Sequence, residues 1–123
     1  MMTPFDIQMC VADAMQDDDI ENIDSIRRML NNATESSWRA ARGQEFTVDE
    51  VETAIRELLR TTMITPCAES PQGGECVPIA AERVDSDFPI ESLWFHLEQS
   101  GRDAVNQWWE SIGRVRFPLE QAD

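Results

Sequence analysis

The chain has 123 residues, enough for one domain with a core of its own, and no stretch is apolar for long enough to cross a bilayer. Its net charge is −14, with 24 acidic residues against ten basic ones, all ten of them arginine. A field of that sign repels phosphate backbones and anionic membrane surfaces, so it argues against nucleic-acid and membrane partners and favours basic ones. Salt-adapted and merely well-dispersed proteins carry a similar excess of acid, so the charge alone does not indicate a function.

The N-terminal segment and the cysteines indicate a compartment. The chain starts MMTPFDIQMC, which lacks the basic region and the unbroken apolar region of a signal peptide. Cys10 is expected to be a small core residue. Cys67 and Cys76 flank the turn-prone segment Ser-Pro-Gln-Gly-Gly and could face each other across a hairpin, reduced or oxidised. A cytoplasmic protein, in which a reduced pair is favoured, is the expected setting.

Helical patterns fill the first 62 residues. The first helix is expected over residues 4–16 with Thr3 as its cap, and the second follows the acidic run 17–19, which suits a helix start. A short helix is expected around Trp38, with its ring in the core. The apolar stripes of the first two helices are Ile7, Val11, Ala14 and Met15, and then Ile20, Ile23, Ile26 or Arg27, and Leu30.

The strongest helical pattern covers residues 47–62. Thr47 and Glu50 have the spacing of a capping box, and Phe46 and Val51 have the spacing of a hydrophobic staple. The face expected to be buried comprises Val48, Val51, Ala54, Ile55, Leu58 and Leu59.

Short strands are expected next. Residues 63–67 predict a strand that ends at Pro66 or lies at a sheet edge, because proline lacks a backbone N–H. A turn at residues 73–74 and a return strand at 76–79 follow. Residues 93–97 alternate between two faces, with Leu93, Phe95 and Leu97 on one and Trp94 and His96 on the other.

A last helix is expected over residues 99–112, with Gly113 as its stop and residues 114–123 as an extended tail. Val105, Trp109 and Ile112 can share its core stripe, which leaves Trp108 about 100° away and exposed. Arg114 and Arg116 surround this end with the only net-basic patch of the chain. The candidate partner surface is therefore Trp108, Trp109, Arg114 and Arg116, for a protein partner or a second copy. The alternative is that both rings pack under the tail, covered by Phe117 and Leu119.

The order helix, helix, helix, strand, long turn, strand, helix resembles a winged helix-turn-helix domain, over residues 46–109 in particular. FTVDEVETAIRELLRTTMI resembles the third helix and next strand of that superfamily, with Thr62 where glycine is usual. LWFHLEQSGRDAVNQWW resembles the second wing strand and following helix of MarR-like and PadR-like regulators, with Leu97, Gly101 and Arg102 matching and Glu98 in place of threonine. The resemblance implies a mainly α fold with a small antiparallel β-sheet in one domain, residues 1–113, and implies no function.

In a DNA-binding member of that superfamily, Arg56 and Arg60 would lie on the helix that enters the major groove. The outer face of that helix has a net charge of −2, and residues 65–92, the wing, carry six acidic residues against one arginine. Both contact elements have the wrong sign for phosphate. Ion pairs of the two arginines with Glu52 and Glu57 are the favoured interpretation.

No nucleophile elbow, phosphate-binding loop, metalloprotease or dinucleotide motif occurs in the sequence. A zinc site built from Cys67, Cys76 and His96 lacks the short cysteine spacing that makes such a site specific, so a packed surface histidine is favoured. We therefore expect that the protein is not an enzyme and that it binds no cofactor and no metal, and the sequence identifies no small-molecule substrate. The predicted function is a protein-interaction or regulatory module, and the alternative is a DNA-binding transcriptional regulator acting as a dimer.

Overall fold

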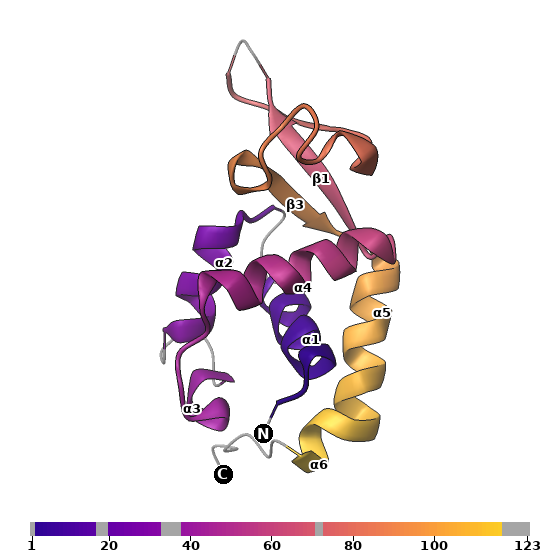
Figure 1. The fold of residues 1–123 in the computed structure, drawn as a ribbon. Coiled ribbons are helices and arrows are strands. Elements are labelled where there is room, and N and C mark those ends of the chain that lie inside the picture. Colours follow the sequence, from indigo (N-terminus) through magenta and orange to yellow (C-terminus); the bar gives the residue numbers. More distant parts are fainter. Residues whose placement is uncertain (1, 17–19, 33–37, 71–72, 117–123) are drawn as a thin grey trace.

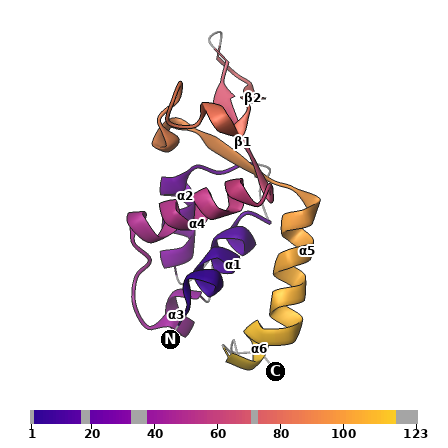
Figure 2. The same ribbon diagram turned by 45° about the vertical axis from the view of Figure 1, so that its right-hand side comes forward.

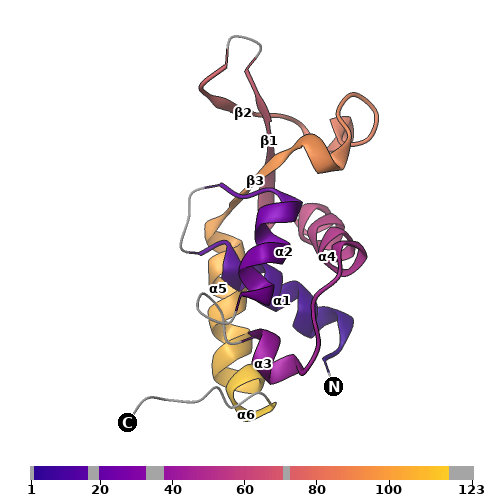
Figure 3. The same ribbon diagram turned by 90° about the vertical axis from the view of Figure 1, so that its left-hand side faces the viewer.

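A computed structural model describes residues 2–16, 20–32, 38–70 and 73–116. The fold is mainly helical, with one small antiparallel sheet that stands at one end of the helices (Figure 1). The same view turned by 90° shows the sheet and its long connections extending away from the helical part (Figure 3). Within the described ranges, no helix is long and apolar enough to span a membrane.

Helix α1 (Pro4–Ala14) lies in the middle of the helices, against α2 (Ile23–Asn31), α4 (Val48–Arg60) and α5 (Gln99–Trp108) (Figures 1 and 2). Its predicted cap is confirmed, because the Thr3 hydroxyl accepts from the Asp6 N–H and the Asp6 carboxylate accepts from the Thr3 N–H. The helix ends at Ala14, two residues earlier than expected. Its buried residues lie on most sides rather than on one stripe: Asp6, Gln8, Met9, Cys10, Val11, Ala12 and Ala14.

The start of α2 differs from the prediction. Residues 17–19 lie outside the described part of the chain, and the cap is Asn22, whose side chain accepts from the Ser25 N–H. Ile20 precedes the helix, and Ile26 rather than Arg27 is buried with Ile23 and Leu30. A short helix, α3 (Trp38–Arg42), carries the buried Trp38, as expected.

Helix α4 begins with the predicted capping box of Thr47 and Glu50. Val51, Ala54, Ile55 and Leu58 are buried and Leu59 is partly so. Val48 is 48% exposed, so its assignment to the buried face is wrong. Val48 is the first residue of the helix, and the part of the apolar stripe that other side chains cover begins only at Val51.

Helix α4 ends in a turn that requires a left-handed residue. The N–H groups of Thr62 and Met63 donate to the carbonyl oxygens of Leu59 and Leu58, at 3.1 and 3.0 Å. These two hydrogen bonds form a Schellman motif, in which the residue after the cap adopts a positive φ. Thr62 accordingly has a φ of 58°, a conformation that glycine adopts more readily than threonine.

The sheet has the strand order β2-β1-β3, formed by β1 (Ile64–Glu69), β2 (Cys76–Pro78) and β3 (Trp94–Leu97). The prediction that Pro66 ends a strand or marks an edge is wrong, because β1 is the central strand. Pro66 pairs with Phe95, whose N–H and C=O both bond to Glu21 on its other side, so this position of the β1–β3 ladder needs no N–H from proline. The Pro66 carbonyl accepts from the N–H of Ile79, just past β2.

The expected return strand and final strand are both present. Cys67 pairs with Pro78 and Cys76 pairs with Glu69, so the two cysteines are diagonal neighbours rather than directly opposed, and both are free thiols. Two short 3-10 turns, η1 (Ala81–Arg83) and η2 (Ile90–Ser92), lie in the connection to β3. Leu93, Phe95 and Leu97 are buried, as the alternation predicts.

The predicted helix stop at Gly113 is wrong. Helix α5 passes through a π-helical turn, η3 (Trp109–Gly113), into α6 (Arg114–Arg116), so residues 114–116 are helical rather than extended. A Cβ atom on Gly113 would lie 2.9 Å from the Trp109 ring and 3.0 Å from the Trp108 ring. Glycine is needed here because the two indoles close over it. Residues 117–123, with Phe117 and Leu119, lie outside the described part.

The substitution Thr62→Gly should stabilise the protein. The left-handed conformation costs a non-glycine residue about 1–2 kcal/mol, against about 0.5–1 kcal/mol for the extra backbone entropy that glycine loses. We expect a gain of about 0.5–1 kcal/mol in the free energy of unfolding, measured by urea denaturation. The matched control is Thr53→Gly, an exposed site in the middle of α4 that should lose about 0.3–0.5 kcal/mol, the difference between the helix propensities of threonine and glycine. Equal losses in both variants would contradict the assignment of strain to Thr62.

Candidate functional site

Three tryptophans pack together where α3 and the end of α5 meet α1. The ring centroids of Trp38 lie 5.5 Å from Trp108 and 5.6 Å from Trp109. The Trp108 Nε1–H donates to Asp6 at 3.1 Å, and the Trp38 Nε1–H donates to Asp13 at 2.8 Å. The prediction that Trp108 is exposed is therefore wrong: it is 3% exposed, since a carboxylate of α1 supplies its N–H with an acceptor in the interior.

The C-terminal partner surface predicted from the sequence is divided by the fold. Trp108 belongs to the core, whereas Trp109 is half-buried and Arg114 lies at the surface with an ion pair to Glu110 at 3.4 Å. Arg116 is helical and its side chain is outside the description. Ile112 is 41% exposed, so its assignment to the core stripe is wrong, and Val115, which the sequence did not single out, is 75% exposed. Their spacing of three residues on a helix is the signal that could have identified them.

Arg56 and Arg60, the candidate DNA contacts, are both engaged in ion pairs. Arg56 Nε lies 3.2 Å from Glu52 Oε2, and Arg60 Nε lies 2.9 Å from Glu57 Oε2, so the predicted pairing is confirmed. Arg56 also binds Asp85, in the connection between β2 and β3, which no local spacing indicated. Hydrogen bonds from Arg56 and Arg60 hold the pKa of the Asp85 and Glu57 carboxyls below their ordinary range.

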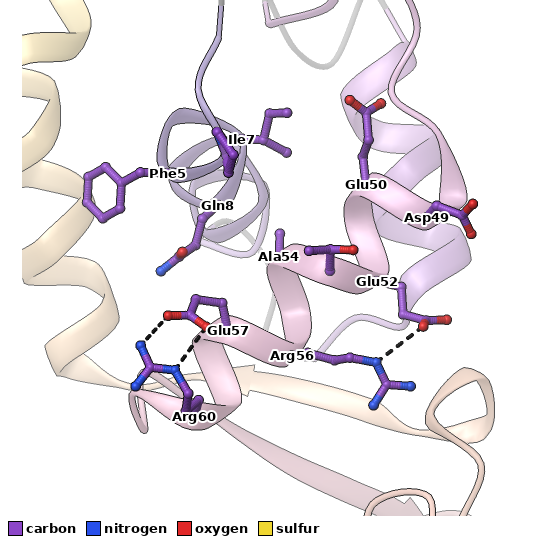
Figure 4. Close-up of a pocket in the computed structure, with 12 residues that line it drawn as sticks. Phe5, Ile7, Gln8, Asp49, Glu50, Glu52, Ala54, Arg56, Glu57 and Arg60 are labelled. Atoms are coloured by element: carbon purple, nitrogen blue, oxygen red, sulfur yellow. Dashed lines mark hydrogen bonds and ion pairs between the residues drawn. The ribbon is translucent and has the colours of Figure 1, made fainter.

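A groove of about 880 Å³ runs between α1 and α4 (Figure 4). Pro4, Phe5, Ile7 and Ala54 contribute apolar surface, and Phe5 is 48% exposed. The carboxylates that line it come from α4: Asp49, Glu50, Glu52 and Glu57. No local sequence pattern indicates this groove, because it depends on how two helices more than 30 residues apart in the chain pack together.

Gln8 is the buried polar side chain of the groove. The residue is 6% exposed, and its amide points toward α4 (Figure 4). None of the hydrogen bonds among the described side chains involves this amide. An amide carries two donors and an acceptor, so Gln8 offers both kinds of group to whatever enters the groove.

Glu50 joins the groove to α3. Its Oε1 accepts from the Thr47 N–H at 3.0 Å and from Arg42 Nη1 at 2.9 Å. The Arg42 side chain is only 8% exposed and lies 4.6 Å from the centre of the Phe46 ring. The hydrogen bonds from Arg42 lower the pKa of the Glu50 carboxyl below its ordinary value.

The two cysteines of the sheet and His96 were the other candidates for a catalytic or metal site. Burial raises the pKa of the Cys67 thiol to about 11 and also raises the pKa of Cys76, so both are protonated at neutral pH. His96 lies half-buried on β3, paired with Thr65. Among the residues that the structure describes, no group of three or more His, Cys, Asp and Glu side chains is arranged to hold a metal ion.

Replacing Glu50 with glutamine should weaken the fold in a pH-dependent way. A glutamine can still cap α4, but it loses the charge that faces the nearly buried Arg42, a cost of about 1 kcal/mol at pH 7. The pKa of the Glu50 carboxyl is lower in the folded protein than in the unfolded chain, where it is about 4.3. The ion pair therefore stabilises the fold above about pH 4.3, and this stability is lost as the pH falls through the pKa of the folded state.

The measurement is urea denaturation of the wild type and Glu50→Gln at pH 7 and at successively lower pH. The difference between them should shrink below about pH 4.5, and Glu91→Gln, at an exposed site, should show no difference at either end. A Glu50→Gln loss that is independent of pH would contradict the ion pair.

No protein-family model, no curated protein and no solved structure matches the chain. The chemistry of the α1–α4 groove and of the outer face of α4 is therefore the basis on which a function can be proposed.

Proposed function

We propose that the chain is a non-catalytic, winged-helix-like module that binds protein rather than nucleic acid. Three longer helices, α1, α2 and α4, precede β1; a long connection containing β2 leads to β3; and α5 follows. This order, with a small antiparallel sheet at one end of the helices, supports a winged helix-turn-helix relationship. The positive φ of Thr62, at the place where the superfamily pattern has glycine, supports it as well.

The charge on the outer face of α4 is the main observation that argues against DNA binding. In a winged helix this helix would enter the major groove, where Arg and Lys side chains neutralise phosphates and read bases. Here Asp49, Glu52 and Glu57 lie on it, and Arg56 and Arg60 bind carboxylates of the protein itself. The helix therefore presents an acidic, internally paired surface rather than free cations.

In the connection between β1 and β3, as on α4, carboxylates of the protein bind the arginine side chains. Asp85 reaches back to Arg56, so an acidic side chain of the wing occupies the guanidinium that a phosphate would need. Arg83, the one arginine of the wing, binds Asp87 at 2.7 Å. Both elements that would contact DNA carry their arginines in ion pairs.

A surface at the C-terminal end of α5 and α6 is a second place for a protein partner or another copy of the chain. Ile112 and Val115 are exposed there beside the half-buried Trp109 and the ion pair of Arg114 with Glu110. A group of exposed apolar residues marks a place where a partner can bind, and the tryptophan beside them is of the residue type that anchors such contacts.

The alternative, a dimeric DNA-binding regulator, is tested by titrating labelled random duplex with the protein at low salt and following fluorescence anisotropy. We expect no binding at protein concentrations of tens of micromolar, which lie within the usual range of non-specific dissociation constants, about 1–100 μM. The double variant Arg56→Ala, Arg60→Ala should behave like the wild type, since neither arginine is available to phosphate.

The proposal would be contradicted if the wild type binds the duplex with micromolar affinity and a steep salt dependence, and if the double variant no longer binds it. Arg114→Ala is the matched control, because it removes an exposed, ion-paired arginine from the opposite end of the helical part (Figure 1). A loss confined to the Arg56 and Arg60 variant would identify α4 as a nucleic-acid contact.

A further inference from the structure

We infer that the groove between α1 and α4 binds a basic amphipathic helix of a protein partner. This inference rests on the proposed protein-binding function and adds the location and the chemistry of the partner. Three independent features of the groove support it: its charge, its apolar floor and the amide of Gln8.

The charge of the groove is not balanced by its own arginines. Asp49 and Glu52 lie one helical turn apart on the α4 side, and Asp49 makes no ion pair among the described residues. Glu52 shares Arg56 with Asp85, so two carboxylates have one guanidinium between them. Two negative charges along one edge of the groove would attract two basic side chains of a ligand.

The floor of the groove is apolar and open. Phe5 is 48% exposed in the first turn of α1, and Pro4, Ile7 and Ala54 line the same space. An exposed phenylalanine beside other apolar side chains gains free energy when a ligand covers it. The ligand must therefore carry apolar side chains as well as basic ones.

Gln8 gives the groove a directional polar group. It is 6% exposed, its amide points into the space between the helices, and no described residue hydrogen-bonds to that amide (Figure 4). Its amide atoms are not among the fully buried, unpartnered side-chain atoms of the described residues, so they reach the open space of the groove, where a ligand can bind them in place of water. A basic side chain of the ligand can donate to its oxygen, and a hydroxyl or carbonyl oxygen can accept from its nitrogen.

The shape of the groove favours a helix as the ligand. Its walls are two helices, one on each side, so a ligand lies along a channel rather than inside a closed pocket. An amphipathic helix presents apolar residues at spacings of three and four with basic residues beside them, which matches an apolar floor and an acidic edge. The acidic edge repels a nucleic acid.

The experiment uses the full chain and a fluorescein-labelled 14-residue peptide of leucine and lysine in an amphipathic helical pattern. Binding is measured by anisotropy at about 0.1 M salt, where long-range attraction is screened beyond about 10 Å. Two further peptides of the same length serve as controls, one with serine in place of leucine and one with glutamate in place of lysine. We expect that only the leucine–lysine peptide binds.

Paired variants locate the site. Phe5→Ser should weaken binding about tenfold, and Val77→Ser, which removes an apolar residue that is also 48% exposed but lies on β2, should leave it unchanged. Asp49→Lys should weaken binding about tenfold or more, and Glu91→Lys, with the same change in net charge at an exposed site outside the groove, should change it less than about twofold. All four sites are exposed, so the variants should keep the wild-type circular dichroism spectrum.

Three results would overturn the inference. The serine peptide could bind as well as the leucine peptide, or the members of each variant pair could behave alike; either result reduces the binding to general charge attraction. In sedimentation, the free protein could be a dimer that Phe5→Ser dissociates, which would make a second copy the occupant. If the peptide does not bind and the protein does not bind DNA either, only the groove site is contradicted. Salt-sensitive DNA binding through Arg56 and Arg60 would instead contradict the proposed function.

Discussion

Two carboxylates of α1 accept the indole N–H groups of tryptophans that lie far away in the sequence, and the arrangement of the helices depends on these contacts. Asp6 and Asp13 are seven residues apart, so they lie on one side of the helix, and they bind Trp108 and Trp38. A buried carboxylate and a buried indole each require a hydrogen-bond partner, and each supplies what the other lacks. Asp6 also closes the cap of α1 with Thr3, so the start of the first helix and the end of α5 are held by the same side chain.

This constraint decides which parts of α1 remain available to a partner. With the Asp6 and Asp13 side held by the tryptophans, α1 packs against α2, α4 and α5, and most of its side chains are buried. The first-turn Phe5, Ile7 and Gln8 remain to line the groove beside α4. The outer face of α4, with its arginines paired, forms the other wall. An acidic interaction surface with an apolar floor follows from the same packing that builds the core.

Local chemistry predicted much of the fold, and contacts between distant residues account for what it missed. The capping boxes of Thr3 and Thr47 involve residues three apart and were predictable, as were the alternation of β3 and the pairs of Arg56 and Arg60 with carboxylates on the same helix. The burial of Trp108 depends on Asp6, which lies 102 residues away, and helical spacing alone placed Trp108 outside. The central position of β1, the continuation of the helix through Gly113 and the groove itself likewise depend on neighbours that no local pattern specifies.

Hydrogen exchange of the four indole N–H protons, followed by NMR, tests the central role of α1 most directly. The chain has four tryptophans, and Trp38 and Trp108 donate to carboxylates of α1, whereas Trp94 and Trp109 are half-buried without such a bond among the described residues. We expect two slowly exchanging indole protons, with opening free energies close to that of global unfolding, and two that exchange rapidly. Similar exchange rates for all four, or protection of Trp109 in place of Trp108, would contradict the account.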